Sequence, residues 1–218
     1  MGQSFAVGYL LFLGKGALWT VGLSSIALLC GGILALVVAL CRISPQKWLR
    51  LAMALYIQLI QGTPVLVLMF LMYFGLPSLG WSVSPLLAAS VSLSLYVSAY
   101  LGESWRAAIQ AVPRAQWEAA ECLALSRMQR MTKVILPQAV RIATPPTVGF
   151  MVQIIKNTSL ASVVGFIELV RAGQIVNNTI FQPFLIYLLI AILYFSMCYP
   201  LSIFSRKLEA KAGEKSYA

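Results

Sequence analysis

The chain has 218 residues, of which 60% are hydrophobic and only 10% are charged. Soluble domains carry about 25% charged residues and about 45–50% apolar ones, so this composition excludes an ordinary soluble protein and indicates an integral membrane protein. The sequence contains no histidine and no aspartate. His-dependent catalysis, Ser-His-Asp triads and His/Asp metal sites are therefore excluded, and we predict no catalytic residue and no metal ligand in this chain.

The formal net charge is +10, which on a soluble domain would favour binding to nucleic acid. Here most lysines and arginines stand just outside apolar runs, where the cytoplasmic loops of membrane proteins concentrate them. We therefore attribute the basic charge to membrane topology and expect no nucleic acid partner.

Five apolar stretches are long enough to cross a bilayer, which takes about 20 mostly apolar residues. They are residues 17–41, 51–76, 85–112, 137–155 and 183–204. Two shorter apolar pieces do not qualify as spans. Residues 3–13, within an N-terminal segment 1–16, are expected at the membrane interface among lipid headgroups. Residues 160–170 are predicted to form about three helical turns that lie at the membrane or dip into it.

The distribution of basic residues predicts the orientation of the chain. If the N-terminus is outside, thirteen of the sixteen lysines and arginines fall on the cytoplasmic side. We thus predict a single transmembrane domain over residues 1–218, with five transmembrane helices and a cytoplasmic C-terminus. The uncharged loop at 75–84 then faces outward, and a polar tail at 207–218 lies inside.

The longest predicted cytoplasmic segment, residues 113–136, has an unusual composition for a loop. Its residues 116–134 are rich in Glu, Ala, Leu, Arg, Met and Gln, which favour a helix, and its apolar residues have mixed helical spacing. We expect an amphipathic helical excursion on the cytoplasmic surface. It either lies on lipid or binds a protein partner, and its two embedded glutamates and the lack of a dense basic face favour the protein.

In this excursion Glu118-Ala119-Ala120 is followed after three residues by Ala124 and, nine residues later, by Val134-Ile135-Leu136-Pro137. The spacing resembles the signature loop of ABC importer permeases, which reads Glu-Ala-Ala, three residues, Gly, nine residues, Ile, any residue, Leu-Pro. Ala124 replaces the glycine and Val134 replaces the isoleucine of that pattern. Because a left-handed turn between two short helices is easiest for glycine, Ala124 implies either a different turn or about 1 kcal/mol of strain.

The resemblance extends over nearly the whole chain. Polar amino-acid permeases of the histidine/glutamine type are similar at Gln61-Gly62-Thr63-Pro64, at Ala99-Tyr100 with Glu103 and Arg106, and at Lys156-Asn157-Thr158-Ser159-Leu160. This resemblance implies an all-α membrane protein with the type I ABC importer permease fold, in a bacterial inner membrane. It also implies that the chain forms half of the translocation path of an ATP-driven importer of polar amino acids.

The resemblance further implies partners for this chain. A separate ATPase subunit dimer would hold ATP and Mg, and this sequence lacks a Gly-rich loop ending in Gly-Lys-Ser/Thr, so we expect no cofactor in the chain itself. An extracytoplasmic binding protein would deliver the amino acid, and a second permease chain would pair with this one within the membrane lipid. The residues implied to couple to the ATPase are Glu118, Ala119, Ala120, Ala124, Ser126, Leu136 and Pro137.

Three groups of residues are candidates for the substrate pathway: Gln61, Gly62, Thr63 and Pro64; Glu103 and Arg106; and Lys156, Asn157, Thr158 and Ser159. Each group also has a purely structural interpretation. The first would be a simple helix kink, the second an ion pair between residues three apart on one helix face, and the third a cap of the following helix. An ionisable residue inside a membrane and a broken helix at mid-membrane are both typical of binding sites. The family often has Arg at the position of Gln61 and Asp at that of Asn157, which favours a heterodimer in which a non-identical permease supplies part of the recognition.

Two other functions remain open at this point. One is an ion-coupled secondary carrier that uses Glu103 as its coupling group. The other is a non-transporting membrane scaffold whose excursion binds a soluble partner. A single excursion loop and the absence of an internal inverted repeat disfavour the carrier.

Overall fold

The computed structural model describes residues 2–214, with side chains for residues 7–211, and over that range the chain forms helices and no strand. The α-helices are α1 (Gly2–Arg42), α2 (Lys47–Gly62), α3 (Val65–Phe70), α4 (Leu76–Ser78), α5 (Pro85–Gln110), α6 (Arg114–Cys122), α7 (Arg127–Gln129), α8 (Leu136–Asn157), α9 (Leu169–Ile180) and α10 (Pro183–Glu214). Two π-helical segments, η1 (Leu71–Gly75) and η2 (Arg130–Ile135), and one 3₁₀ turn, η3 (Thr158–Ser162), join them.

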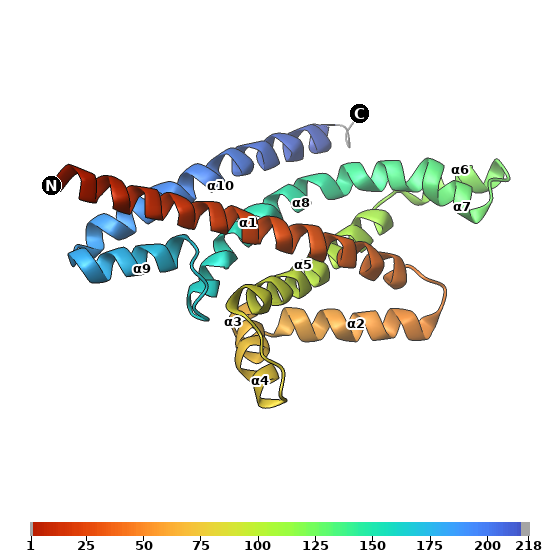
Figure 1. Ribbon diagram of the computed structural model, residues 1–218. Coiled ribbons are helices and arrows are strands. Elements are labelled where there is room, and N and C mark those ends of the chain that lie inside the picture. Colours follow the sequence, from red (N-terminus) through yellow and green to blue (C-terminus); the bar gives the residue numbers. More distant parts are fainter. Residues whose placement is uncertain (1, 215–218) are drawn as a thin grey trace.

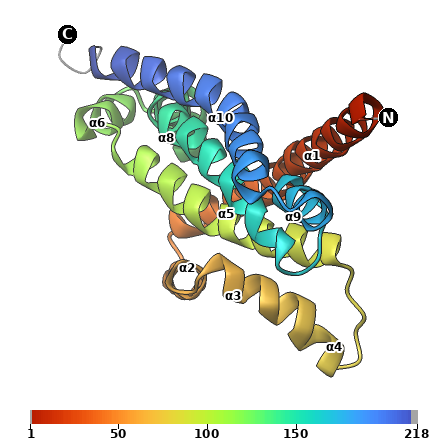
Figure 2. The ribbon, with the colours of Figure 1, turned by 90° about the vertical axis from the view of Figure 1, so that its left-hand side faces the viewer.

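The helices form successive layers. α10 packs on α8, α8 on α5, and α5 on α2 and α3, while α1 runs along much of the length of the molecule against α5 (Figures 1 and 2). The main core lies where α1, α5 and the end of α8 meet, and includes Leu23, Leu93, Val97 and Ile154, none of which is exposed. The fold thus buries one stripe of each long helix and leaves many large apolar side chains of α1 and α10 on the outside, which is the expected surface of a protein solvated by lipid.

The N-terminal segment and the first predicted span form one helix. α1 has 41 residues and runs without a break from Gly2 to Arg42, so the division at residue 16 is absent from the secondary structure. Gly16 does not end the helix. It allows α1 to approach α9, because a Cβ at this position would lie 2.8 Å from the Cβ of Ala172. The interfacial location of residues 1–16 stays a prediction, and Met1 lies outside the described residues.

The second predicted span is broken, as the Gly62-Thr63-Pro64 sequence led us to expect. α2 and the segment from α3 to α4 are bent by 98° relative to each other. Three helical segments within the described residues are long and apolar enough to cross a membrane, namely Val7–Arg42, Pro85–Gln110 and Pro183–Lys211, and the bent pair brings the number to four. The predicted total of five also requires α8, which has 22 residues but carries Arg141 and Lys156.

The prediction of a helix over residues 160–170 is wrong. The 3₁₀ turn η3 ends at Ser162, and Gly165 adopts a φ of 87°, a left-handed conformation that glycine reaches without strain. The helix in this region, α9, begins only at Leu169. The apolar composition of the stretch reflects burial of Ala161 and Val164 in the core, not helical structure.

Helices α1 and α5 approach each other closely through two glycines. A Cβ at Gly31 would lie 2.6 Å from the Cβ of Val97, and one at Gly102 would lie 2.7 Å from Cγ1 of Val38. Small residues at helix crossings allow such close approach between membrane helices, where van der Waals packing replaces the hydrophobic effect as the main source of association. The backbones of α1 and α5 therefore lie in close contact at this crossing.

A buried carboxylate joins α1, α9 and α10. Glu168 has no exposed surface, and its two oxygens accept hydrogen bonds from the backbone N–H groups of Val170 and Arg171, both at 2.8 Å, which caps the N-terminus of α9. The hydroxyl of Tyr194 on α10 donates to Oε2 of Glu168 at 3.0 Å, and Thr20 on α1 lies 3.5 Å from the same atom. The Thr20 oxygen also accepts a hydrogen bond from the Leu169 N–H at 3.2 Å.

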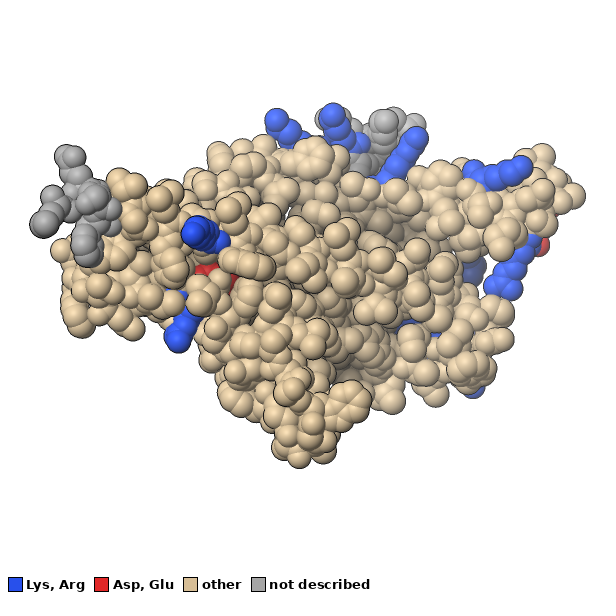
Figure 3. All heavy atoms as spheres, in the orientation of Figure 1, with Lys and Arg blue, Asp and Glu red and all other residues tan. Residues whose placement is uncertain are grey.

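Charged side chains are unevenly distributed on the surface. On the face shown in Figure 3 the middle is almost free of charge, whereas most Lys and Arg side chains lie along the rim formed by the C-terminal part of α10 and at the end that carries α6 and α7. The C-terminal stretch predicted as a polar tail is helical as far as Glu214, the end of α10, and residues 215–218 lie outside the described part of the chain.

Candidate functional site: the coupling loop and the membrane pathway

The excursion predicted at 113–136 forms a short helical hairpin at one end of the molecule. α6 and α7 lie beyond the ends of α1 and α2, to the right in Figure 1. The expected helix over 116–134 is divided into α6, α7 and η2, because the backbone turns between α6 and α7. We refer to residues 113–136 as the coupling loop.

The turn of the coupling loop is left-handed at Ala124, where φ is 52°. The Ala124 N–H donates to the carbonyl of Glu121 at 2.9 Å, and the Leu125 N–H donates to that of Ala120 at 3.3 Å. These two bonds define a Schellman motif that ends α6, and its left-handed position is usually glycine. Ala124 thus occupies the conformation for which the signature pattern has glycine, at a cost of about 1 kcal/mol.

Local hydrogen bonds and one ion pair fix the hairpin after the turn. The Ser126 Oγ accepts from the Gln129 N–H at 3.3 Å, and Oε1 of Gln129 accepts from the Ser126 N–H at 2.9 Å. This reciprocal pair is a capping box, which starts α7. Nη1 of Arg130 lies 2.9 Å from Oε1 of Glu121, so the ion pair ties η2 back to α6.

The outer surface of the coupling loop combines small, acidic and apolar side chains. Glu118 and Ala119 are exposed, as are Leu123 at 74% and Met128 at 72%, whereas Ala120 is only 2% exposed and faces the inside. Glu118 has no ion-pair partner among the described residues. An exposed carboxylate beside exposed apolar side chains suits a protein partner better than it suits water alone.

The remaining loop candidates lie at the start of α8. Leu136 is half-buried in a small core with Ile109, Ile135 and Trp117, and Pro137 is exposed in the first turn of α8, where its missing N–H is not needed. These residues join the hairpin to the long helix α8, so a displacement of α6 and α7 acts directly on α8.

Glu103 and Arg106 form an ion pair, the structural alternative for this group. Nη2 of Arg106 lies 2.5 Å from Oε1 of Glu103, and Nε of Arg106 donates to Oε2 at 2.9 Å. Nε of Arg42, at the end of α1, lies 3.4 Å from the same Oε2. Both oxygens of the Glu103 carboxylate already face guanidinium groups. The arrangement therefore favours a structural role, in which Glu103 joins α5 to the end of α1, over binding of a substrate ammonium group.

The break in the second span is supported by Thr63. Its hydroxyl donates to the Leu59 carbonyl at 2.8 Å, and Pro64 precedes α3 as its N-cap. Gln61 stands one residue before the break and its Nε2 donates to the Ala99 carbonyl of α5 at 3.3 Å. The side chains of Thr63 and Gln61 thus satisfy backbone carbonyls in this state.

The hydroxyls after α8 also bond to the backbone. Thr158 is buried and donates to the Ile155 carbonyl at 2.7 Å, and Ser159 donates to the Lys156 carbonyl at 2.7 Å. Lys156 is exposed and lines a cavity of about 310 Å³ between α8 and α10, together with Arg206. Asn157 interacts with the side chain of Tyr96 on α5.

Asn157 lies beside a cluster of aromatic rings that sequence analysis did not identify. The ring centroids of Tyr96 and Tyr100 on α5 are 4.5 Å apart, and that of Phe150 on α8 lies 5.8 Å from Tyr96 and 5.5 Å from Tyr100. The Tyr96 hydroxyl interacts with the Asn157 side chain, whose Oδ1 accepts from Gln153 at 3.2 Å. The spacing of the two tyrosines, one helical turn apart, was the signal that could have identified this cluster.

The described residues contain no group of three or more His, Cys, Asp or Glu side chains that could hold a metal ion. Aromatic rings such as those of Tyr96, Tyr100 and Phe150 can hold an amine by cation–π contact, and an amide side chain such as that of Asn157 can donate N–H groups to a carboxylate.

Comparisons with known proteins agree on one family. Residues 27–213 match the family model described as "Binding-protein-dependent transport system inner membrane component". The chain is 37% identical over 197 residues to the "Probable amino-acid ABC transporter permease protein YckA" of Bacillus subtilis (strain 168), covering 90% of this chain and 87% of the relative. It is 35% identical over 200 residues to the "L-cystine transport system permease protein TcyB" of the same organism, covering 91% and 86%. A solved structure described as "Crystal structure of an amino acid ABC transporter with histidines" has a TM-score of 0.89 and 32% identity, covering 94% of this chain and 96% of that chain.

Proposed function

This chain belongs to the family of binding-protein-dependent transport system inner membrane components, and from that membership we propose that it is the permease subunit of an ATP-driven importer of polar amino acids. The resemblance predicted from the sequence is confirmed at the level of the family, and so is the all-helical permease fold. Relatives named for amino acids, glutamine and L-cystine support an amino acid as the substrate. The carrier and scaffold alternatives find no support among these relatives.

The observation that carries the proposal is the geometry of the coupling loop. Its hairpin projects beyond the long helices, and its turn places Ala124 in the left-handed conformation that the signature pattern assigns to glycine (Figure 1). An ATPase subunit dimer is the partner we assign to this surface, with Glu118, Ala119 and the exposed Leu123 and Met128 as its contacts. ATP and Mg are held by that partner, and this chain is not itself an enzyme.

In the membrane, five segments span the bilayer: α1, the broken pair from α2 to α4, α5, α8 and α10. α8 has 22 residues and is thus about 33 Å long, close to the thickness of a hydrocarbon core. The basic residues at the end with α6 and α7 support a cytoplasmic location for that end and an outside location for the N-terminus. This placement corresponds to a bacterial inner membrane protein that meets an amino-acid-binding protein on its outer side.

The substrate passes the aromatic cluster of Tyr96, Tyr100 and Phe150 next to Asn157. These residues are only half-buried, they come from two different helices, and they contain no charge of their own. A charged substrate therefore needs a counter-charge from elsewhere, which supports a second, non-identical permease chain. Copurification with mass measurement of the bound chains tests the heterodimer directly.

The coupling role is tested with Glu118→Arg in the importer reconstituted into vesicles. We expect substrate-stimulated ATP hydrolysis and amino acid uptake to be lost, because the substitution reverses the charge of an exposed contact with the ATPase. Membrane insertion is expected to be unchanged, since Glu118 makes no ion pair within the described residues. Glu209→Arg is the matched control, because Glu209 is also exposed but lies on α10, away from the coupling loop.

Normal uptake by Glu118→Arg would remove the coupling role. Uptake that requires ATP and persists with an ionophore supports the importer, whereas loss with the ionophore would indicate a carrier. No uptake by the wild-type complex under any condition would indicate a scaffold.

The pathway is tested with Asn157→Ala and Phe150→Ala. We expect a raised KM for transport with ATP hydrolysis in the absence of substrate unchanged, because both side chains lie beside α5 and away from the coupling loop. Ile142→Ala serves as the control on the same helix, because Ile142 is exposed and lies about two turns before Phe150. A KM unchanged in both variants would show that the substrate passes elsewhere.

A further inference from the structure

Two hollows meet at Ile109, where the ends of α1 and α5 lie beside η2 and the start of α8. One is an apolar groove of about 370 Å³ between α1, α5 and α8. The other is a cavity of about 370 Å³ walled by the ends of α1 and α5, the first turn of α2, and the coupling loop. Ile109 lines both of them.

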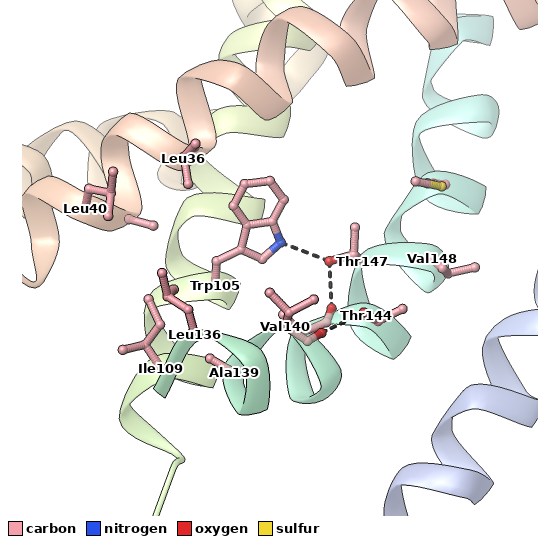
Figure 4. Close-up of a pocket in the computed structure, with 13 residues that line it drawn as sticks. Leu36, Leu40, Trp105, Ile109, Leu136, Ala139, Val140, Thr144, Thr147 and Val148 are labelled. Atoms are coloured by element: carbon pink, nitrogen blue, oxygen red, sulfur yellow. Dashed lines mark hydrogen bonds between the residues drawn. The ribbon is translucent and has the colours of Figure 1, made fainter. Parts of the chain in front are cut away.

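The apolar groove offers no free polar group to an occupant. The Thr144 and Thr147 hydroxyls donate to backbone carbonyls one turn earlier at 2.6 and 2.7 Å, and the Trp105 Nε1 donates to the Thr147 oxygen at 2.9 Å (Figure 4). The other side chains around it are apolar: Met151 carries a thioether, and the rest are aliphatic, such as Leu36 and Val140 (Figure 4). Only hydrocarbon fits this lining without loss of hydrogen bonds.

The second cavity is strongly basic. It is lined by four arginines: Arg42, Arg50, Arg127 and Arg130. Arg42 and Arg130 pair with Glu103 and Glu121, respectively, and Glu103 is shared with a further arginine. Arg50 and Arg127 have no carboxylate partner within the residues that the structure describes. The cavity thus contains more guanidinium groups than carboxylates. This excess favours binding of a phosphate group, to which a guanidinium donates two parallel N–H hydrogen bonds.

The two hollows follow each other along the same helices. On α1 the groove is lined by Leu36 and Leu40 and the basic cavity by Arg42, and on α5 the order is Trp105 and then Gln110. The apolar groove therefore lies further from the ends of α1 and α5, and the basic cavity lies at those ends, next to the coupling loop. An occupant of both has a hydrocarbon chain at one end and an anionic group at the other.

We propose that this pair of hollows is a binding site for an anionic phospholipid, with an acyl chain in the groove and the phosphate among the arginines. The proposal rests on the membrane placement given under the proposed function, with the coupling loop on the cytoplasmic side, but not on the identity of the transported amino acid. The headgroup would contact Trp117 of α6 and Arg127 of α7. Lipid binding is thereby linked to the position of the coupling loop.

The test is lipid retention by the full-length chain purified with its partner subunits. The delipidated complex is incubated with equal amounts of phosphatidylglycerol and phosphatidylcholine, and bound lipid is counted by native mass spectrometry. We expect preferential retention of phosphatidylglycerol, and a loss of roughly 30-fold in its affinity in the double variant Arg50→Gln/Arg127→Gln. Neither arginine has an ion pair to lose among the described residues, and the Arg50 side chain donates one long hydrogen bond, to the Ser44 carbonyl at 3.5 Å, so we expect the fold to be retained. The control Lys133→Gln/Arg141→Gln removes two exposed positive charges that line neither hollow and is expected to bind as the wild type does.

A second variant tests the groove without any change in charge. Ala143→Leu narrows the groove and is expected to lower phosphatidylglycerol affinity roughly tenfold, the equivalent of about two displaced methylene groups.

Equal retention of the two lipids, or unchanged retention in both variants, overturns the proposal. Displacement of the lipid by inorganic phosphate alone would assign the basic cavity to a soluble anion instead. Retention seen only after the partner subunits are removed would assign it to a protein contact. Since lipid is counted without transport, a failure of the lipid site is distinguishable from a failure of the proposed transport function.

Discussion

The long helices and the coupling loop are held together by different kinds of contact. Within the helices, α1 meets α5 backbone to backbone at Gly31 and Gly102, and Glu168 is buried with hydrogen bonds from three elements. The coupling loop relies on local caps, one ion pair in which Glu121 is 70% exposed, and a left-handed alanine. The helices are thus sensitive to change at these buried positions, whereas the loop is held mainly by contacts between neighbouring residues.

This difference suits the two regions to different tasks. If the loop has the proposed coupling role, bonds between neighbouring residues would keep its shape under a partner's push. The small core of Trp117, Ile135 and Leu136 would then pass the displacement to α8. Tightly packed helices then move as rigid bodies, because close-packed interfaces do not deform continuously. If the comparison holds, substitutions in the helices change stability most, and substitutions in the loop change coupling more than stability.

The largest loss of stability is expected for Glu168→Ala. The substitution removes the N-cap of α9 and leaves the Tyr194 hydroxyl without its buried acceptor, which together cost about 3 kcal/mol. The measurement is the free energy of unfolding in mixed detergent micelles titrated with a denaturing detergent. Glu168→Gln keeps one acceptor oxygen and is expected to lose about half as much. Equal unfolding of Glu168→Ala and the wild type would contradict the structural role of this carboxylate.

The next largest effect is expected for Gly31→Ala. The added methyl would lie 2.6 Å from the Val97 Cβ and 2.7 Å from the Ser94 carbonyl, so α1 and α5 must separate, at a cost of about 1–3 kcal/mol. Gly32→Ala is the matched control, because nothing lies within 4 Å of a Cβ there. It is expected to raise stability by up to about 1 kcal/mol through helix propensity. The same unfolding assay serves both, and a loss of similar size at the two positions would show that α1 and α5 are not in tight contact.

Local patterns predicted the coupling loop well. Helix-favouring composition located the excursion at 113–136. For Ala124 the signature spacing left open a different turn or a strained left-handed one, and the structure contains the left-handed turn. The Gly62-Thr63-Pro64 sequence indicated a break for the same reason: each feature depends on residues within one or two helical turns. Such features can be read from sequence because their physical cause lies in neighbouring residues.

Contacts between distant residues could not be predicted in this way. Glu103 was identified because it is ionisable within an apolar stretch, but its partner Arg42 is 61 residues away, and only the structure decides between an ion pair and a substrate contact. Nothing in the residues next to Glu168 predicts its contact with Thr20, which is 148 residues away in the sequence. The missed start of α9 has the same origin, since a composition that is apolar for burial was interpreted as helix.

A smaller effect, of opposite sign, is expected for Ala124→Gly in the loop. Glycine adopts a φ of 52° without a Cβ penalty, so the substitution is expected to stabilise α6 and its turn by about 1 kcal/mol. The measurement is protection of the loop against amide hydrogen exchange or limited proteolysis. Ala119→Gly, at an exposed position within α6, is the control and is expected to lose about 1 kcal/mol. Lower protection in Ala124→Gly than in the wild type would show that the turn has another conformation.

The smallest effect is expected for Glu121→Gln, which removes the ion pair with Arg130. Because Glu121 is 70% exposed, solvent screens the pair, and its loss is expected to cost no more than about 0.5 kcal/mol. Glu118→Gln is the matched control on the same helix and is expected to leave stability unchanged, since Glu118 has no ion pair within the described chain. The measurement is the free energy of unfolding of both variants at roughly 0.02 M and roughly 0.5 M salt, because added salt screens exposed ion pairs. Only the difference between Glu121→Gln and the wild type is expected to shrink at the higher salt concentration. A cost above that of Gly31→Ala would mean that the loop is held as firmly as the helices, and the contrast between the two regions would no longer apply.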